Sequence, residues 1–424
     1  MLFTLVTIWL VTSLAAITLA QDKPKDLTDL LNDQKNLTEF TTLLTKQYGD
    51  IYANLSFQDQ VTILAPSNAA FAKIPYSTLG PAFLNNQSDV VRSVLEYHIV
   101  PGIQRAESYN GSFRFTPTWL SDSGDTNVTG GQVVGGVQQA GNVNVFISGL
   151  GTRSTLEKAN LAFSGGIVHI IDTFLVPPAD FIATAPQFNL SAAGGAATNA
   201  SLDEYLNTAT DVTMFVPNND AFQRLGSAFT SMPLAELARV LDYHIVNGTD
   251  TVYYSSKLPN NTILNTRQGK KLTVTFASNS LFVNSARVLQ EDILIANGVM
   301  HVIDNVLDYN ATEAKPNPEI QTQGAIIQGS SLSGNVVPFS SYLPNTVSSF
   351  SSASPSAGAS SFGITDIGSG ASNTAFGNAR STSSSTAGGA VHTGTSKGVG
   401  DRVYSPGSGL GGVFGAIVLG AGFL

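Results

Sequence analysis

The sequence predicts two tandem domains of the α+β class, because three sequence blocks occur twice and in the same order. Each copy has an apolar segment ending in Pro-x-Asn-x-Ala-Phe, then a Tyr-His pair, then Gly-x-x-His-x-Ile-Asp. Within each copy, helical patterns come first and strand patterns follow, which is typical of an α+β domain and not of an alternating parallel one. The paired blocks span residues 61–71 and 212–222, 94–100 and 240–246, and 166–172 and 298–304.

The spacing between blocks separates a fixed frame from variable loops. The segment from Asn68 to His98 is longer than its counterpart from Asn219 to His244. Length differences of this kind are tolerated where a chain runs over the surface. We therefore interpret the blocks as the scaffold and the insertions as surface loops.

Apolar spacing predicts the helices. Leucine and phenylalanine recur at helical intervals over residues 26–48, which predicts one or two amphipathic helices. In the second copy, Ser201 to Glu204 matches a capping box and predicts a helix that buries Leu202, Tyr205 and Leu206. A second apolar stripe predicts a helix that ends near each Tyr-His pair.

Strands are predicted where apolar residues alternate or run together. The segments beginning at Val61 and Val212 alternate and then end at a proline, which has no N–H to donate to a sheet. Asn68 and Asn219 are expected to cap the short helix that follows each of them. Further strands are expected at residues 143–147, 167–174, 281–284 and 299–306.

The ordered blocks resemble the fasciclin domain of extracellular adhesion proteins, and the resemblance covers roughly residues 24 to 309. It implies a compact β-sandwich or wedge covered by several helices in each copy. We place the first domain at residues 24–180 and the second at residues 185–310.

Composition limits the kinds of partner. The chain has no cysteine, so each domain has to rely on its packed core and not on disulfides or thiolate chemistry. The net charge is −9 and no Lys/Arg cluster occurs, which argues against nucleic acid and anionic membrane surfaces. Only 12% of residues are charged, so the sequence predicts that glycans solubilise much of the surface.

Asn-x-Ser/Thr sequons are frequent and all precede residue 311. They predict a heavily N-glycosylated folded region. The sequon asparagines are Asn36, Asn54, Asn86, Asn110, Asn127, Asn189, Asn199, Asn247, Asn260 and Asn310.

The two ends of the chain match targeting signals. Residues 1–20 are apolar and end in small residues, which predicts a secretory signal peptide, with a membrane anchor as the alternative. Residues 311–408 are dominated by Ser, Gly and Thr and predict a disordered, O-glycosylated stalk. Residues 409–424 match the removable tail of a glycolipid (GPI) anchor signal, with Gly394 or Ser396 as the attachment residue; a disordered Gly-rich end is the alternative.

The repeated histidines, His98 and His169 in one copy and His244 and His301 in the other, raise the question of metal binding or catalysis. Zinc needs three or four ligands, and the other repeated candidates are Asp172 and Asp304 alone. Side chains alternate between the two faces of a strand, so residues three positions apart point to opposite faces. This applies to His169 and Asp172, and equally to His301 and Asp304. We therefore expect structural histidines without metal or cofactor, and aspartates that accept backbone N–H bonds at strand ends.

No catalytic signature was found in the sequence. The G-x-S-x-G elbow, the H-E-x-x-H pair, the P-loop and the dinucleotide fingerprint are absent. The sequence favours a protein that is not an enzyme.

The resemblance adds candidate binding residues. In animal relatives, a Tyr-His segment and an Asp-Ile pair before the last strand are associated with receptor binding, which implies Tyr97, His98, Tyr243, His244, Asp292 and Ile293 here. The first domain has Asn160 and Leu161 at the place of the Asp-Ile pair. Alternation of Ile293 and Ile295 favours a core role for that segment.

Two functional hypotheses follow. The first is a cell-surface glycoprotein that mediates adhesion or cell-wall and matrix contact, with surface proteins or glycans as partners and a glycolipid anchor holding it to the membrane. The second is a secreted or wall-bound module that binds a polysaccharide or small ligand through loop aromatics. The candidate rings for stacking on sugars are Tyr109, Trp119, Tyr253 and Tyr254, and the equal alternative is that they are loop anchors over the core.

Overall fold

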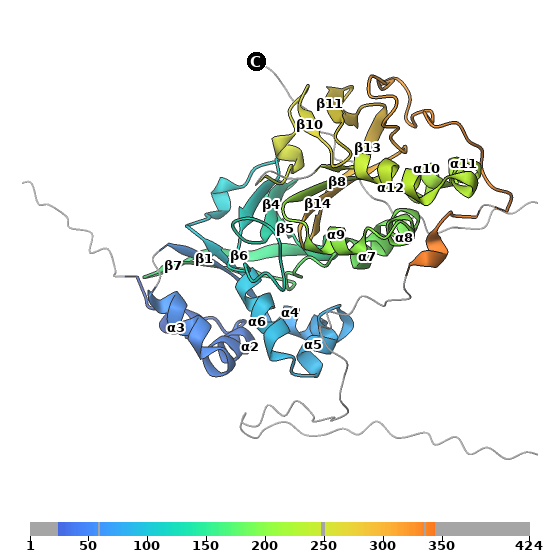
Figure 1. Cartoon of the computed structure of the whole chain (residues 1–424). Helices are drawn as coiled ribbons and strands as arrows, with labels where there is room; N and C mark the ends of the chain where they lie inside the picture. The colour runs from blue at the N-terminus through green and yellow to red at the C-terminus, as the bar shows by residue number, and fades with distance from the viewer. Residues whose placement is uncertain (1–23, 58–59, 247–250, 335, 344–424) are drawn as a thin grey trace, which may run out of the picture. The chain divides into compact units, whose positions relative to one another are not determined.

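The computed structural model describes residues 24–57, 60–246, 251–334 and 336–343 (Figure 1). It confirms two tandem domains, each built on one seven-stranded sheet. The strand orders are β2-β1-β7-β6-β5-β4-β3 in the first domain and β10-β11-β12-β13-β14-β8-β9 in the second. Read from opposite ends, the two orders match strand for strand.

The first domain begins with helices and then forms its sheet. Its helices are α1 (Leu27–Asp33), α2 (Thr38–Thr42), the π-helical turn η1 (Leu43–Gln47), α3 (Gly49–Phe57), α4 (Asn68–Lys73), α5 (Gly80–Leu84) and α6 (Ser88–Tyr97), with 3₁₀ turns η2 (Ile74–Tyr76), η3 (Ala106–Ser108) and η4 (Gly149–Gly151). Its strands are β1 (Val61–Pro66), β2 (Ile99–Pro101), β3 (Arg114–Pro117), β4 (Val133–Gln139), β5 (Val143–Ile147), β6 (Arg153–Phe163) and β7 (Gly166–Ile171).

The second domain repeats this plan with fewer residues in its loops. Its helices are α7 (Phe181–Thr184), α8 (Ser191–Asn199), α9 (Asp203–Thr208), α10 (Asn219–Arg224), α11 (Gly226–Ser231) and α12 (Leu234–Tyr243), with 3₁₀ turns η5 (Ala185–Phe188) and η6 (Ser255–Lys257), and η7 (Ser340–Tyr342) further along the chain. Its strands are β8 (Val212–Pro217), β9 (Ile245–Val246), β10 (Ile263–Asn265), β11 (Lys271–Ala277), β12 (Ser280–Val283), β13 (Ala286–Ile295) and β14 (Gly298–Ile303).

Each sheet contains a parallel strand pair, which forms its second and third strands counted from the β2 or β9 edge. β1 pairs with β7, and β8 pairs with β14, over six residues each, and both strands of each pair are largely buried. The repeated glycine of the third block starts β7 and β14. A Cβ atom at Gly166 or Gly298 would overlap the carbonyl oxygen of Val61 or Val212, so only glycine lets the strands come this close.

The repeated asparagines cap helices, but not the ones that follow them. The Oδ1 of Asn68 accepts a hydrogen bond from the N–H of Glu39 (3.1 Å), in the first turn of α2. The Oδ1 of Asn219 accepts from the N–H of Ala192 (2.8 Å), in the first turn of α8. The capping chemistry was predicted correctly, but its target was wrong, because an upstream helix packs back against the start of α4 and α10.

The predicted capping box at Ser201 is also wrong. Helix α9 begins at Asp203 with Leu202 at its N-cap, and Ser201 has φ of 56°, in the left-handed region. The burial of Leu202 and Leu206 and the partial burial of Tyr205 were predicted correctly. Tertiary packing of these apolar side chains, and not a local cap, sets the start of this helix.

Residues 311–343 differ from the predicted stalk. The segment packs against the second domain, with Gln323 only 4% exposed and with Ile327, Val337 and Phe339 against its hydrophobic core. The described part of the chain therefore departs from a stalk that starts at residue 311. Serine and glycine content misled the prediction, because a few apolar side chains suffice to dock an extended segment.

Several predictions concern residues outside the described ranges. They are the signal peptide at residues 1–20, the sequon at Asn247, the stalk beyond residue 343, the attachment candidates Gly394 and Ser396, and the tail at residues 409–424. Within the ranges the structure describes, no helix combines the length and apolar character needed to cross a bilayer.

Candidate binding surfaces

The Tyr-His pair of the first domain lies at the end of α6 and is fully buried. The Nδ1 of His98 donates to the carbonyl of Val94 (2.6 Å), and its Nε2 accepts from the N–H of Leu175 (2.9 Å). Both ring nitrogens are thus used by the neutral imidazole, and burial lowers the pKa of His98 to about 4. The hydroxyl of Tyr97 donates to the carbonyl of Val133 (2.7 Å), and burial raises the pKa of Tyr97.

The second domain repeats this arrangement at the end of α12. The Nδ1 of His244 donates to the carbonyl of Val240 (2.8 Å), and its Nε2 accepts from the N–H of Leu307 (2.9 Å). Burial lowers the pKa of His244 to about 4. Tyr243 donates its hydroxyl hydrogen to the carbonyl of Lys271 (2.9 Å). In both domains the histidine ties a helix end to the segment after the last strand, which confirms the predicted structural role.

The second pair of histidines holds a β-bulge. The Nε2 of His169 donates to the carbonyl of Gln104 (2.8 Å), and its Nδ1 accepts from the N–H of Asn160 (3.2 Å). His301 bonds the carbonyl of Tyr253 (2.9 Å) and the N–H of Asp292 (3.3 Å) in the same way. These histidines therefore link the bulged strand to the loop that follows the Tyr-His helix.

Asn160 and Asp292 occupy the bulge in the two domains, with φ of 54° and 59°. Asparagine and aspartate tolerate this left-handed conformation better than other residues. The Oδ1 of Asn160 accepts from the N–H of Ala106 (3.1 Å), and the Asp292 carboxylate accepts from the N–H (2.7 Å) and hydroxyl of Ser255. Each side chain therefore holds the corresponding loop of its own domain in place.

The binding candidates implied by the resemblance are thus inside the domains. Exposed fractions are 0% for His98 and 4% for His244, and 8% and 3% for Asp292 and Ile293. Tyr97 and Tyr243 are fully buried. Their visible role is to hold the core and the bulge, and a binding role for them stays a prediction.

The repeated aspartates accept backbone hydrogen bonds as predicted. The Oδ1 of Asp172 accepts from the N–H of Thr155 (2.7 Å), and that of Asp304 accepts from the N–H of Arg287 (2.8 Å). Burial raises the pKa of Asp304, although backbone hydrogen bonds oppose the shift. In the described part of the chain, no three His, Asp or Glu side chains gather in a way that could hold a metal ion.

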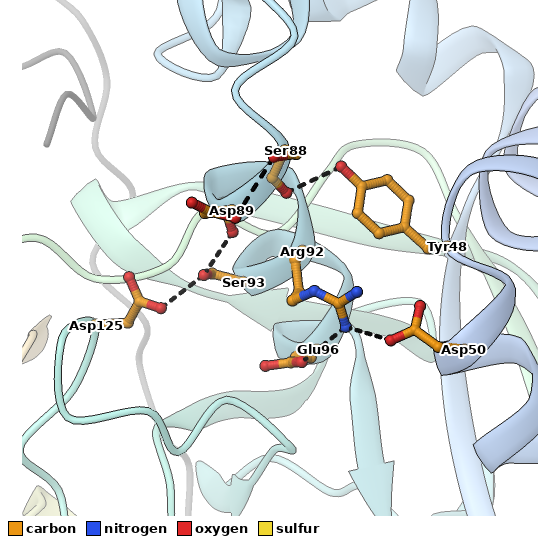
Figure 2. A network of polar contacts seen from close by, with 8 residues as sticks. All are labelled: Tyr48, Asp50, Ser88, Asp89, Arg92, Ser93, Glu96 and Asp125. Carbon is orange, nitrogen blue, oxygen red and sulfur yellow. Dashed lines mark hydrogen bonds and ion pairs between the residues drawn. The ribbon is translucent and has the colours of Figure 1, made fainter. Parts of the chain in front are cut away.

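Exposed polar chemistry gathers on α6 of the first domain (Figure 2). The guanidinium of Arg92 pairs with Asp50 (2.8 Å) and Glu96 (3.8 Å), and lies 5.7 Å from the ring centre of Tyr48. One turn of helix separates Arg92 from Glu96, so both extend from the face opposite the buried stripe. The hydroxyl of Ser93 donates to Asp125 (2.6 Å), in the loop after β3.

Two hollows flank this network. One has a volume of about 300 Å³, and its lining includes Tyr48, Phe83, Asn86, Asp89 and Arg92. The other is more open, and its lining is Glu96, Trp119, Ser121, Asp122 and Ser123. We call Arg92, Glu96 and the two hollows the α6 surface.

The pKa values of two carboxyl groups at the α6 surface shift in opposite directions. The adjacent Arg92 guanidinium lowers the pKa of Asp50. Partial burial raises the pKa of Glu96, and the nearby carboxylates of Asp125 and Asp122 act in the same direction. This surface was missed in the sequence, although the polar positions between the apolar residues of the 90–98 stripe were the available signal.

The four loop aromatics considered for sugar binding differ in how exposed they are. Trp119 is half-buried and lines the open hollow. Tyr109 and Tyr254 are buried, at 6% and 4% exposure, and Tyr253 is half-buried with its carbonyl bound to His301. Of the two alternatives, Tyr109 and Tyr254 therefore follow the second, because they pack as anchors over the core and are not exposed for stacking on a sugar.

Apolar side chains of the two domains meet beside Tyr254. Its ring stacks on Phe115 of the first domain with ring centres 4.3 Å apart. The surrounding cluster contains Val128 and Val133 from the first domain and Val252, Leu294 and Val299 from the second.

Buried polar groups complete this contact. The carboxylate of Asp211 accepts from the N–H (2.8 Å) and hydroxyl (2.5 Å) of Thr129, and Asp211 is 2% exposed. The side chain of Gln132 donates to the carbonyls of Ile295 and Ala296 (3.2 Å each). Each of these bonds joins one domain to the other.

Most of the described sequons display their asparagine to solvent. Asn127 and Asn199 are half-buried, and the Nδ2 of Asn127 donates to the carbonyl of Asn207 (3.2 Å) in the second domain. The exposed asparagines are Asn36, Asn54, Asn86, Asn110, Asn189, Asn260 and Asn310.

Comparison with known proteins identifies the family. A model of the fasciclin domain matches residues 35–177 and 189–309. The chain belongs to the fasciclin domain family. A fasciclin-like arabinogalactan protein of Arthroderma benhamiae is 33% identical over 319 residues, which cover 74% of this chain and 72% of that protein.

Two further comparisons each cover about two thirds of this chain. The fasciclin-like arabinogalactan protein elcF of Phaeosphaeria nodorum is 29% identical over 290 residues, covering 68% of this chain and 90% of that protein. Among solved structures, a FAS1 domain pair from the insect cell adhesion molecule fasciclin I matches 65% of this chain and 98% of its own, with 19% identity and a TM-score of 0.32.

Proposed function

We propose that this fasciclin-domain protein is a non-enzymatic surface glycoprotein that mediates adhesion or cell-wall and matrix contact. The observation that carries the proposal is the use of the repeated histidines. His98 and His244 are buried and neutral, and both ring nitrogens of each are occupied by backbone groups. No lone pair or proton of these rings is left for catalysis, so recognition falls to exposed surfaces.

The α6 surface is the proposed contact site. It combines an aromatic side chain, a cation and several carboxylates around two hollows, which suits contact with a polar protein or glycan partner. A weak site of this kind gains strength when many copies share one surface, because each contact raises the effective concentration of the next.

Cell attachment tests the proposal. We expect cells that display the full chain to aggregate or attach, and we expect Arg92→Glu combined with Trp119→Ala to reduce attachment several-fold at equal surface amounts. Arg105→Glu is the matched control, because Arg105 is exposed in the same domain and is absent from the lining of both hollows. Equal attachment of the double variant and the native chain would exclude the α6 surface.

We further propose secretion, N-glycosylation at the exposed sequons and attachment by a glycolipid anchor near Gly394 or Ser396. Exposed asparagines at most described sequons support the glycosylation. Release from cells by a phosphatidylinositol-specific phospholipase, and a processed C-terminus between residues 388 and 400 by mass spectrometry, are the expected results. A chain that keeps residues 409–424 on the cell would refute the anchor.

Binding of a hydroxyl-rich sugar is a second candidate function, favoured by the open hollow. Trp119 offers a ring face, while Glu96 and Asp122 offer hydrogen-bond acceptors for sugar hydroxyls. Glycan-array binding that disappears in Trp119→Ala and survives in the Arg105→Glu control would favour this function over protein contact.

A further inference from the structure

A segment beyond the second sheet packs back onto the helices of the second domain. We call the described residues 323–334 and 336–343 the strap. Its first residue, Gln323, donates its N–H to the Asp304 carboxylate (2.7 Å), and Asn305 donates to the carbonyl of Gly324. Further along, Ser227 and Ser330 exchange hydrogen bonds: the N–H of Ser227 donates to the Ser330 carbonyl (2.9 Å), and the N–H of Ser330 donates to the Ser227 hydroxyl (2.8 Å).

The strap supplies a ring that the first domain supplies from within its own fold. In the first domain, Phe71 and Phe83 both pack edge-on against Phe174, with ring centres 4.8 and 5.4 Å from it. Alignment of Asp172 with Asp304 places Val306 opposite Phe174, so the second domain lacks this ring.

Phe339 of the strap takes the place of the missing ring. Its ring packs edge-on against Phe222 and Phe229, which are the counterparts of Phe71 and Phe83, at 6.2 and 5.5 Å. The two domains therefore complete the same aromatic cluster from different parts of the chain. The second cluster is complete only while the strap is docked.

Helix α8 is shaped to receive the strap. Gly194 and Gly195 lie in its middle, where each glycine disfavours a helix relative to alanine. A Cβ atom at Gly195 would overlap the carbonyl oxygen of Phe339, and one at Gly194 would lie 2.8 Å from Leu343. The first domain, which has no strap, carries Thr41 and Thr42 at the aligned positions.

The docked strap also holds Phe339 in an unfavourable backbone conformation. Its φ of 64° lies in the left-handed region, which is unfavourable for a residue with a bulky side chain. Pro338, directly before it, is buried, and the Phe339 ring is half-buried. Ring packing has to offset this strain, so the docking is weaker than its contacts alone suggest and can be reversed.

We propose that the second domain carries a binding groove for a Pro-Phe turn, and that the strap is its resident ligand. The floor is the glycine pair of α8, and the walls are Phe222 and Phe229. The strap thus acts as a latch: undocking it uncovers this apolar groove and frees the chain after residue 322.

The substitution Gly195→Ala in the full chain tests the groove, because it removes no atom of the strap. Alanine raises helix propensity, so without the strap it would stabilise α8. With the strap, we expect the opposite sign: amide hydrogen exchange over residues 323–343 and chymotryptic cleavage after Phe339 or Tyr342 rise about tenfold or more. Thr42→Ala, at the aligned position of the first domain, is the control and leaves both rates unchanged.

A second measurement covers the case in which Gly195→Ala disturbs α8 itself. The full chain with Phe339→Ala keeps the groove intact and weakens its resident ligand. We expect a fluorescent peptide of residues 326–343 to bind this variant more tightly than the native chain, and the same peptide with Phe339→Ala not to bind. Unchanged exchange in Gly195→Ala, or equal binding of both peptides, would overturn the proposal.

Discussion

The two domains share a buried frame but differ in what completes it. The histidine hydrogen bonds, the position of the bulge and the parallel strand pair are the same in both domains. The aromatic cluster of the first domain is completed by Phe174, shortly after β7. The cluster of the second domain is completed by Phe339 of the strap. The interactions that stabilise the sheet are therefore the same in both copies, whereas the side chains that complete the aromatic cluster beside the helices differ.

The largest contrast is expected from removing the third ring in each domain. Phe174 is 4% exposed, so Phe174→Ala should destabilise the first domain by about 3–5 kcal/mol. Phe339 is half-buried and strained, so Phe339→Ala should lower the stability of the second domain by about 1–2 kcal/mol and leave it folded. Urea denaturation measures both, and Trp119 fluorescence reports on the first domain. Equal losses would mean that the strap is as integral as the sheet.

Acid should affect the two domains alike, because their histidines are bonded alike. His98 and His244 have a pKa of about 4 when folded and 6.5 when unfolded, so folding favours the neutral ring. Their contribution is fully present above pH 6.5 and is lost as the pH falls from 6.5 to 4. The loss is on the order of 3 kcal/mol per histidine. Urea midpoints measured from pH 7 to pH 4.5 should fall in both domains, and a flat profile in either would contradict the burial of its ring.

Repetition in the sequence was enough to predict the frame. In the third block, for example, only glycine fits at Gly166 and Gly298, where a Cβ atom would overlap a neighbouring carbonyl oxygen. Contacts that occur once were not predictable in this way. The strap has the composition of a linker, and its docking depends on Phe339 meeting two rings over 100 residues earlier in the chain. The α6 surface was likewise assembled from distant elements, since Tyr48, Arg92 and Trp119 show no shared pattern along the sequence.

A smaller effect is expected at the contact between the domains. Asp211→Ala would remove a buried carboxylate that accepts hydrogen bonds from the N–H and hydroxyl of Thr129, at a cost of about 2 kcal/mol. Because the bond joins the domains, we expect their unfolding transitions to separate in scanning calorimetry. Ser67→Ala, which removes a buried hydroxyl within the first domain, is the control and should leave the coupling intact. Unchanged coupling in Asp211→Ala would show that the apolar cluster at Tyr254 alone joins the domains.

The smallest change in the free energy of unfolding is expected from a substitution at the α6 surface. The same substitution tests whether this surface contributes to attachment and not to stability. Arg92 is 40% exposed and its partner Asp50 is 59% exposed, so solvent and salt screen the pair. Arg92→Ala should therefore change the free energy of unfolding by less than about 1 kcal/mol, and less at high salt. Attachment, in contrast, should fall several-fold if this surface meets the partner. A large loss of stability would reassign Arg92 to the fold of the first domain, where the ring of Tyr48 beneath it would be the contact that was lost.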